Sequence, residues 1–190
     1  MYFSILLLFF VIGTIFGSFY NVVGYRIPKG ESLLYPSSHC TKCNHKLGAL
    51  ELIPVLSFLF LGGKCKKCKD KISWFYPIFE FCSGLLFALS FVVFGFSLEC
   101  LLSIVFISML LIIIISDYQT MIIPDSVLII FSAMIMIIKY FMIGIEGVGI
   151  SFLHSIGAFI FMLLLKLFGD FYLKKNQWVE EILNYLLFLD

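Results

Sequence analysis

Charged residues are scarce in this sequence. Asp, Glu, Lys and Arg make up 13% of the 190 residues, whereas soluble domains carry about 25%. Hydrophobic residues make up 62%, and the mean hydropathy is +1.09. A soluble domain of this length could not bury so much apolar surface. The composition therefore excludes a soluble globular domain and predicts an all-α polytopic membrane protein.

Several signals for other functions are also missing. The sequence has no P-loop, no dinucleotide fingerprint and no serine nucleophile motif. Its net charge of +1 gives no reason to expect a nucleic-acid partner. The first residues lack the basic stretch of a cleaved signal peptide, so Met1–Val23 is expected to be a retained helix. Small residues in it, Gly13, Gly17 and Ser18, would let another helix approach closely.

About five transmembrane helices are predicted from the apolar segments. After the first helix they are expected at Trp74–Phe94, Leu98–Ile115, Ile122–Ile143 and Val148–Phe168. Nine of the thirteen Lys and Arg residues lie between Arg26 and Lys71. By the positive-inside rule this basic loop is cytoplasmic, and counting helices from it puts Asp117 on the same side.

Four cysteines in the basic loop form two Cys-x-x-Cys pairs: Cys40 with Cys43, and Cys65 with Cys68. Each pair can present two thiolates from one tight turn, so two pairs can complete a tetrahedral structural zinc site. Two disulfides or free thiols are the alternatives, although disulfides are rare in the cytoplasm. The other two cysteines, Cys82 and Cys100, are expected to be small core residues.

Two polar residues, Asn21 and Arg26, lie near the end of the first expected helix. Arg26 is expected to extend to the lipid headgroups, whereas Asn21 lies deeper in the helix. Ala49–Leu61 is apolar but too short to cross a core of about 30 Å. It is expected to lie along the membrane interface or to pack on the membrane helices.

The segment Ser116–Asp125, SDYQTMIIPD, separates two apolar stretches and contains Asp117 and Asp125. Carboxylates at the edge of a bilayer are costly and suggest a functional site. The alternative is a short polar turn, since turns collect Asp and Pro.

Three features in this order resemble the type IV prepilin peptidases. GSFYNVVGYRIP closes the first helix, the Cys-x-x-Cys pairs follow, and DYQTMIIPD follows the third helix. The resemblance implies a membrane aspartic endopeptidase of the bacterial cytoplasmic membrane. Such an enzyme cleaves leader peptides of pilin-like and competence pseudopilin precursors after a glycine, on the cytoplasmic side. Many members with the four-cysteine loop also methylate the new amino terminus with S-adenosylmethionine.

The resemblance also implies roles for individual residues. Asp117 corresponds to the first catalytic aspartate, and Pro124 and Asp125 belong to a supporting element, as do Asn21 and Arg26. The four cysteines correspond to the metal site. Two neighbouring carboxyl groups can share a proton, which supplies one acid and one base for peptide hydrolysis.

The second catalytic motif, Gly-x-Gly-Asp followed by Lys, has no clear counterpart. Asp170 in KLFGDFYLKK is a weak candidate because it lacks the earlier Gly, and Tyr172 replaces the Lys. We therefore expect a truncated copy without peptidase activity. The alternatives are that Asp170 supplies the second acid, or that the chain is a non-catalytic zinc-binding membrane module that binds prepilins.

The expected parts of the chain are residues 1–25, the first transmembrane helix; 26–73, the cytoplasmic four-cysteine domain; 74–175, an incomplete peptidase domain of four helices; and 176–190, an aberrant tail.

The tail, residues 176–190, is interpreted as a frameshift product. Lys174, Lys175 and Asn176 can be encoded by a run of adenines, and a shifted register from Trp178 permits the missing Gly-x-Gly-Asp motif. The alternative is an amphipathic tail.

Overall fold

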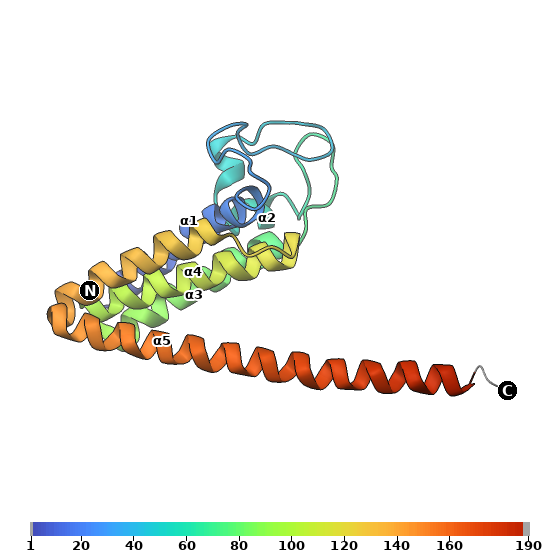
Figure 1. Cartoon of the computed structure of the whole chain (residues 1–190). Helices are drawn as coiled ribbons and strands as arrows, with labels where there is room; N and C mark the ends of the chain where they lie inside the picture. The colour runs from blue at the N-terminus through green and yellow to red at the C-terminus, as the bar shows by residue number, and fades with distance from the viewer. Residues whose placement is uncertain (1, 188–190) are drawn as a thin grey trace. The chain divides into compact units, whose positions relative to one another are not determined.

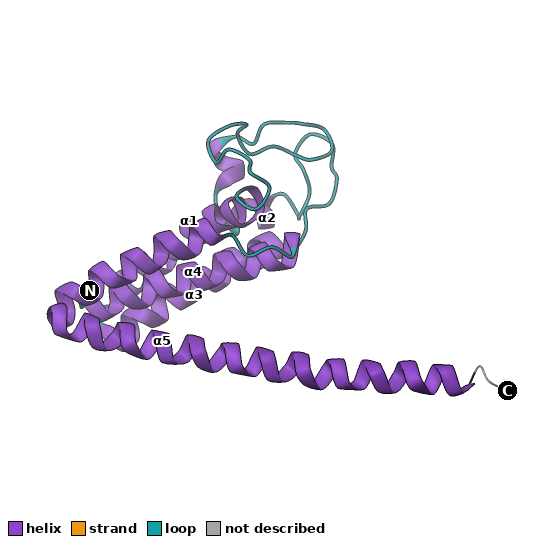
Figure 2. Cartoon of the chain, viewed as in Figure 1, coloured by secondary structure: helices purple, strands orange, loops and turns teal. Residues whose placement is uncertain are grey.

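The computed structural model describes residues 2–187, and all regular elements in that range are helices (Figures 1 and 2). The prediction of an all-α protein is therefore confirmed. The elements are α1 (Tyr2–Arg26), η1 (Ala49–Leu52), α2 (Leu56–Phe60), α3 (Phe75–Phe94), α4 (Leu98–Thr120) and α5 (Asp125–Leu187).

Four helices in the described range are long and apolar enough to cross a membrane. They are α1, α3, α4 and the Asp125–Gly157 part of α5. The expected fourth and fifth helices are joined in α5, whose backbone breaks at Gly144 with φ 67° and ψ −175°. Glycine accepts this conformation without the steric cost that a Cβ would bring. This break lies in the connection expected between Ile143 and Val148, so the structure agrees with two successive helices there. The four spans are counted over the described residues alone.

The chain divides into two compact units, Met1–Ile138 and Lys139–Asp190. The first contains α1, α3, α4, the four-cysteine loop and the start of α5. The second is helical from Lys139 to Leu187, and in it Lys139 Nζ donates to Ser151 Oγ at 3.3 Å. The helix continues past Lys175, so no helix end marks the expected start of the tail at residue 176. Residues 188–190 of that tail lie outside the described range.

Close packing of α1 on α3 depends on glycine. A Cβ at Gly13 would lie 2.7 Å from Ser83 O and 2.8 Å from Gly84 Cα. A Cβ at Gly17 would lie 2.9 Å from Glu80 Cα. Real side chains do not tolerate such distances to backbone atoms, so the expected role of Gly13 and Gly17 in close helix approach is confirmed.

The core of the first unit lies among α1, α3 and α4. Tyr20, Phe87, Ile112 and Ile115 are buried there, and Val127 of α5 joins them. Tyr20 Oη donates to Ser108 Oγ at 2.6 Å, which satisfies a buried hydroxyl between α1 and α4.

The two cysteines outside the loop differ. Cys100 is buried near the start of α4, as expected of a core residue. Cys82 is exposed on α3, so the expectation of a core position is wrong for it. Cys82 lies on a side of α3 where Phe81 and Leu85 are also exposed.

Candidate metal centre and aspartate site

The two Cys-x-x-Cys pairs form two knuckles with the same backbone pattern. In the first, Cys40 N–H donates to His45 O at 3.0 Å and Asn44 N–H donates to Cys40 O at 2.9 Å. In the second, Cys65 N–H donates to Asp70 O at 2.8 Å and Lys69 N–H donates to Cys65 O at 3.0 Å. Each residue of the second knuckle lies 25 positions after its equivalent in the first, as Cys65 does after Cys40.

Further details repeat with the same offset. Asn44 and Lys69 both adopt positive φ, 52° and 60°. The pairs His39–Lys46 and Lys64–Lys71 both form isolated antiparallel bridges. The structure thus shows a local repeat, HCTKCNHK and KCKKCKDK, that the sequence analysis missed; the equal distance between equivalent cysteines was the available signal.

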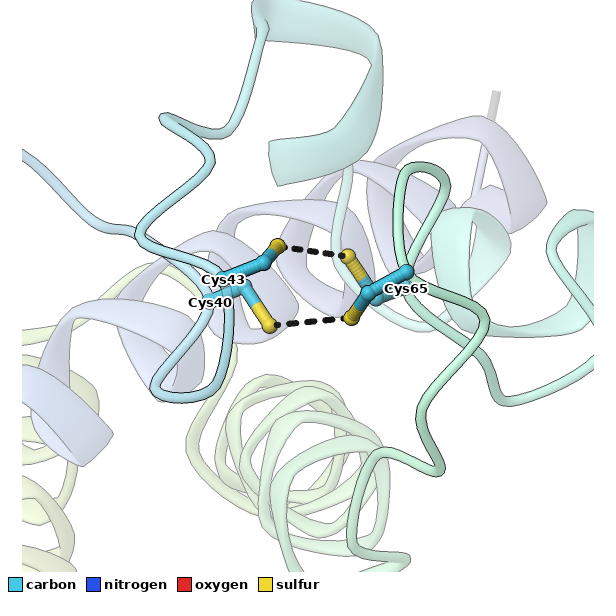
Figure 3. A group of neighbouring side chains, drawn as sticks. Cys40, Cys43 and Cys65 are labelled. Atoms are coloured by element: carbon cyan, nitrogen blue, oxygen red, sulfur yellow. Dashed lines mark hydrogen bonds between the residues drawn. The ribbon is translucent and has the colours of Figure 1, made fainter.

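The knuckles bring four sulfur atoms together. All four Sγ atoms lie within 4.8 Å of one another, and Figure 3 shows the thiols of Cys40, Cys43 and Cys65 facing across the gap. Cys40 and Cys68 Sγ are 3.7 Å apart, and Cys43 and Cys65 Sγ are 3.9 Å apart. Four sulfurs bound to one zinc at about 2.3 Å would be separated by about 3.8 Å. The thiols are free, and their spacing fits a tetrahedral metal site.

Local electrostatics changes the pKa of Cys40 and that of Cys68 in opposite directions. Backbone N–H groups of Cys43 and Lys42 lower the pKa of Cys40 to about 6. The backbone at Asp70 lowers the pKa of Cys68, but partial desolvation and the three neighbouring thiols outweigh it and raise that pKa to about 12. The Cys40 thiol therefore loses its proton more readily than the Cys68 thiol, and a bound cation would displace the protons that remain.

Two side-chain contacts stabilise the region around the thiols. Lys42 Nζ of the first knuckle lies 2.8 Å from Asp70 Oδ1 of the second, and this carboxylate raises the pKa of Lys42. His45 Nε2 lies 3.3 Å from Glu51 Oε2. The four-sulfur group includes neither His39 nor His45, in agreement with four cysteine ligands.

Arg26 connects the end of α1 to the loop. It is only 9% exposed, and its Nη1 donates to Ser32 O at 2.9 Å and to Leu33 O at 3.4 Å. The expectation that it extends to the headgroups is therefore wrong, because nearby backbone carbonyls satisfy the guanidinium instead. Arg26 fixes the direction in which the loop leaves the helix.

Asn21 lies at the α1–α3 contact. It is 5% exposed, and its Nδ2 donates to Gly17 O at 3.2 Å and to Tyr76 O at 3.5 Å. Its Oδ1 has no hydrogen-bond partner among the described residues. Asn21 thus joins the two helices close to the loop.

Glu80 is a polar residue that the sequence analysis missed. It lies in α3, and its Oε2 accepts a hydrogen bond from Val55 N–H at 2.7 Å. Phe58 of α2 packs edge-on against Trp74 with ring centroids 4.6 Å apart. Of the two positions expected for Ala49–Leu61, the structure shows packing on a membrane helix, through contacts of Val55 and α2 with α3. The sequence signal that could have identified Glu80 is that it is the single acid in the apolar run FYPIFEF.

Asp117 lies in the last turn of α4, which extends to Thr120 instead of ending at Ile115. Thr120 Oγ1 donates to Ser116 O at 2.8 Å, and Met121 ends the helix with φ 55°. Ser116, fully buried, donates to Ile122 O in the connection that follows. These local hydrogen bonds lengthen the helix, and the Asp117 side chain remains exposed.

Asp125 is the first residue of α5, after the buried Pro124. Pro124 O accepts from Val127 N–H at 3.1 Å, which begins the helix. A carboxylate is favourable at a helix N-terminus and unfavourable at a C-terminus. Helix stability therefore explains Asp125 but not Asp117.

Tyr118 fixes the end of α4 against α3. Its ring stacks on Phe75 with centroids 4.7 Å apart and an angle of 15° between the planes. This contact ties the last turn of α4, to which Asp117 belongs, to the first turn of α3. Asp170 belongs to the other unit, within α5, and its side chain is not described.

Comparison with known proteins gives a consistent set of relatives. Residues 11–94 match the family described as Bacterial Peptidase A24 N-terminal domain. A prepilin leader peptidase/N-methyltransferase of Bacillus subtilis (strain 168) is 47% identical over 122 residues, which cover 64% of this chain and 49% of the relative. That of Klebsiella pneumoniae is 37% identical over 123 residues, covering 62% and 54%.

A third relative of the same name, from Myxococcus xanthus (strain DK1622), is 39% identical over 117 residues. These residues cover 62% of this chain and 35% of the relative. The chain thus spans about half the length of the curated relatives it matches, or less. No solved structure matches. Over the part of the chain that they cover, these matches confirm the resemblance to the type IV prepilin peptidases that the sequence motifs predict.

Proposed function

We propose that this chain has the fold and metal site of a prepilin leader peptidase, with Asp117 as the first of two catalytic aspartates. The observation that carries the proposal is the four-thiol cluster, which lies inside the matched residues 11–94. The names of the relatives support the substrate class, a prepilin. The proposed place of action is the cytoplasmic side of the bacterial inner membrane.

The proposed chemistry needs two carboxyl groups. One, ionised, takes a proton from water, and the other, protonated, polarises the scissile carbonyl. Asp117 is exposed at a helix end where a carboxylate does not stabilise the helix, which favours a chemical role. Asp125 has a structural role at the start of α5 and is proposed to support the site.

Zinc is proposed to be structural. Four cysteines complete its coordination and leave no open position for water, so the metal would hold the two knuckles together and would not hydrolyse the peptide. The N-methyltransferase activity that the relatives' names give would require S-adenosylmethionine. We assign none of the described residues to that cofactor.

We propose further that this chain alone does not cleave prepilin, because Asp170 is a poor match to the family's second motif. It would bind zinc, insert into the membrane and bind the precursor. The second candidate function, a non-catalytic module that binds prepilins, shares these three properties and is favoured by the same poor match.

A cleavage assay tests the proposal. Purified chain is incubated in detergent with a prepilin, and the mature product is followed by its mobility and by its new amino terminus. We expect no product. Cleavage by the chain, abolished in Asp170→Asn and retained in Asp125→Asn, would contradict this and would identify Asp170 as the second acid.

A further inference from the structure

The apolar segment between the two knuckles leaves large side chains exposed. Phe60 is 85% exposed, Leu50 79% and Leu59 60%, and Trp74 just before α3 is 65% exposed. Soluble loops rarely display such a group of large apolar side chains, and a contiguous apolar surface indicates a binding partner.

This surface is fixed in position beside a membrane span. The Val55–Glu80 hydrogen bond and the Phe58–Trp74 ring contact attach the segment to the first turns of α3. Figure 1 shows α2 close to the end of the bundle where α3 begins. The exposed side chains therefore lie beside the first turns of α3, a helix long and apolar enough to cross a membrane.

A groove of about 220 Å³ lies between α2 and the start of α3. Its lining is apolar and includes Phe58, Leu59, Trp74, Ile78 and Phe81. Ile78 and Phe81 are exposed, as is Leu85 one turn further on. Because residues three and four apart lie on one helix face, the wall of the groove continues into the lipid-facing stripe of α3.

A lysine-rich stretch joins the two segments that line the groove. Five exposed lysines lie in KCKKCKDK, against one acid: Lys64, Lys66, Lys67, Lys69 and Lys71. Lysines at a membrane surface attract anionic headgroups, with about 1 kcal/mol from each. The stretch begins next to the groove, since a Cβ at Gly63, directly before Lys64, would lie 3.0 Å from Phe58 Cζ. An apolar groove and an adjoining lysine cluster fit the two parts of an anionic phospholipid.

We propose that Ala49–Phe60 and Trp74 form a lipid-binding surface of the four-cysteine region. An acyl chain of an anionic phospholipid occupies the groove, and the lysines of the second knuckle contact its headgroup. The bound lipid holds the metal-bearing loop against the membrane. This surface does not depend on the proposed peptidase activity, and it is tested without a cleavage assay.

Tryptophan fluorescence tests the proposal, since the chain has only Trp74 and Trp178. Full-length chain with Phe60→Trp, Trp74→Phe and Trp178→Phe is reconstituted into phosphatidylcholine vesicles with a minority of phosphatidylglycerol. Bromine is placed on the acyl chains of one lipid or the other. We expect the introduced tryptophan to be shielded from acrylamide and to be quenched about twofold more by brominated phosphatidylglycerol than by an equal amount of brominated phosphatidylcholine.

A matched control carries Thr41→Trp, an exposed position of the first knuckle, in the same Trp74→Phe and Trp178→Phe background. It is expected to be open to acrylamide and unquenched by either lipid. The Trp178→Phe chain reports the groove through native Trp74, and its quenching should fall on Lys66→Gln with Lys67→Gln. A Phe60→Trp reporter that is open to acrylamide, is quenched equally by both lipids, or is shielded only when a prepilin is added would overturn the proposal.

Discussion

At the scale of single residues, Gly13 decides how closely α1 approaches α3. Its missing Cβ would lie within 2.8 Å of two backbone positions of α3, Ser83 O and Gly84 Cα. Backbone cannot give way as a flexible side-chain end can. The close contact in turn keeps Asn21 within reach of Tyr76 O.

We predict that Gly13→Ala destabilises the chain by about 1–3 kcal/mol, the usual effect of overpacking. Unfolding in detergent with increasing dodecyl sulfate measures it. Gly149→Ala is the control, because a Cβ there meets nothing within 4 Å and alanine favours helix by up to about 1 kcal/mol. Equal stability of the two variants would show that α1 and α3 are not packed this closely.

Some residues could be assigned from the sequence and others could not. The four cysteines were identifiable because metal sites require a fixed local spacing. Arg26 was not, since its partners Ser32 and Leu33 depend on how the loop folds back. Glu80 was missed for a similar reason, because its contact with Val55 joins residues 25 positions apart.

At the scale of elements, the apolar runs predicted the helices well, with α3 starting one residue later than expected. The polar end of α4 was misjudged, because Ser116 and Thr120 bond to the backbone nearby and lengthen the helix. The break between the last two expected helices was placed correctly, since Gly144 lies in the short connection expected after Ile143.

The paired knuckles carry a prediction of their own. Purified chain should contain about one zinc, and Cys40→Ser with Cys65→Ser should lose it, because this change removes one ligand from each knuckle. Zinc should also be released as the pH falls, because thiols must lose protons to bind it and acid restores them. Metal analysis at several pH values measures both effects.

The control for the metal measurement is Cys82→Ser, which changes a cysteine outside the four-sulfur group. It should retain zinc fully. A chain without zinc, or one whose loop cysteines are recovered as two disulfides, would refute the metal site.

At the scale of the whole molecule, the distribution of lysine predicts the orientation in the membrane. The loop between α1 and α3 should be cytoplasmic, and the connection between α3 and α4 should face outward. In intact cells, a membrane-impermeant maleimide should label Phe96→Cys, in that connection, and should not label Lys67→Cys. The reverse pattern would place the four-cysteine loop outside the cell.

The central claim is that this chain supplies a prepilin peptidase with its metal site and with Asp117. The most direct measurement uses a chimera of residues 1–138 and the remaining carboxy-terminal part of the Bacillus subtilis relative, assayed on a pseudopilin precursor. The chimera should cleave, and Asp117→Asn should lower the rate by about 10²–10⁴-fold, since an amide cannot act as a base. Asp125→Asn should lower it by less than about tenfold, because an acid at a helix N-terminus contributes about 0.3–1 kcal/mol. No cleavage by an inserted, zinc-loaded chimera, or equal losses from the two substitutions, would contradict the account.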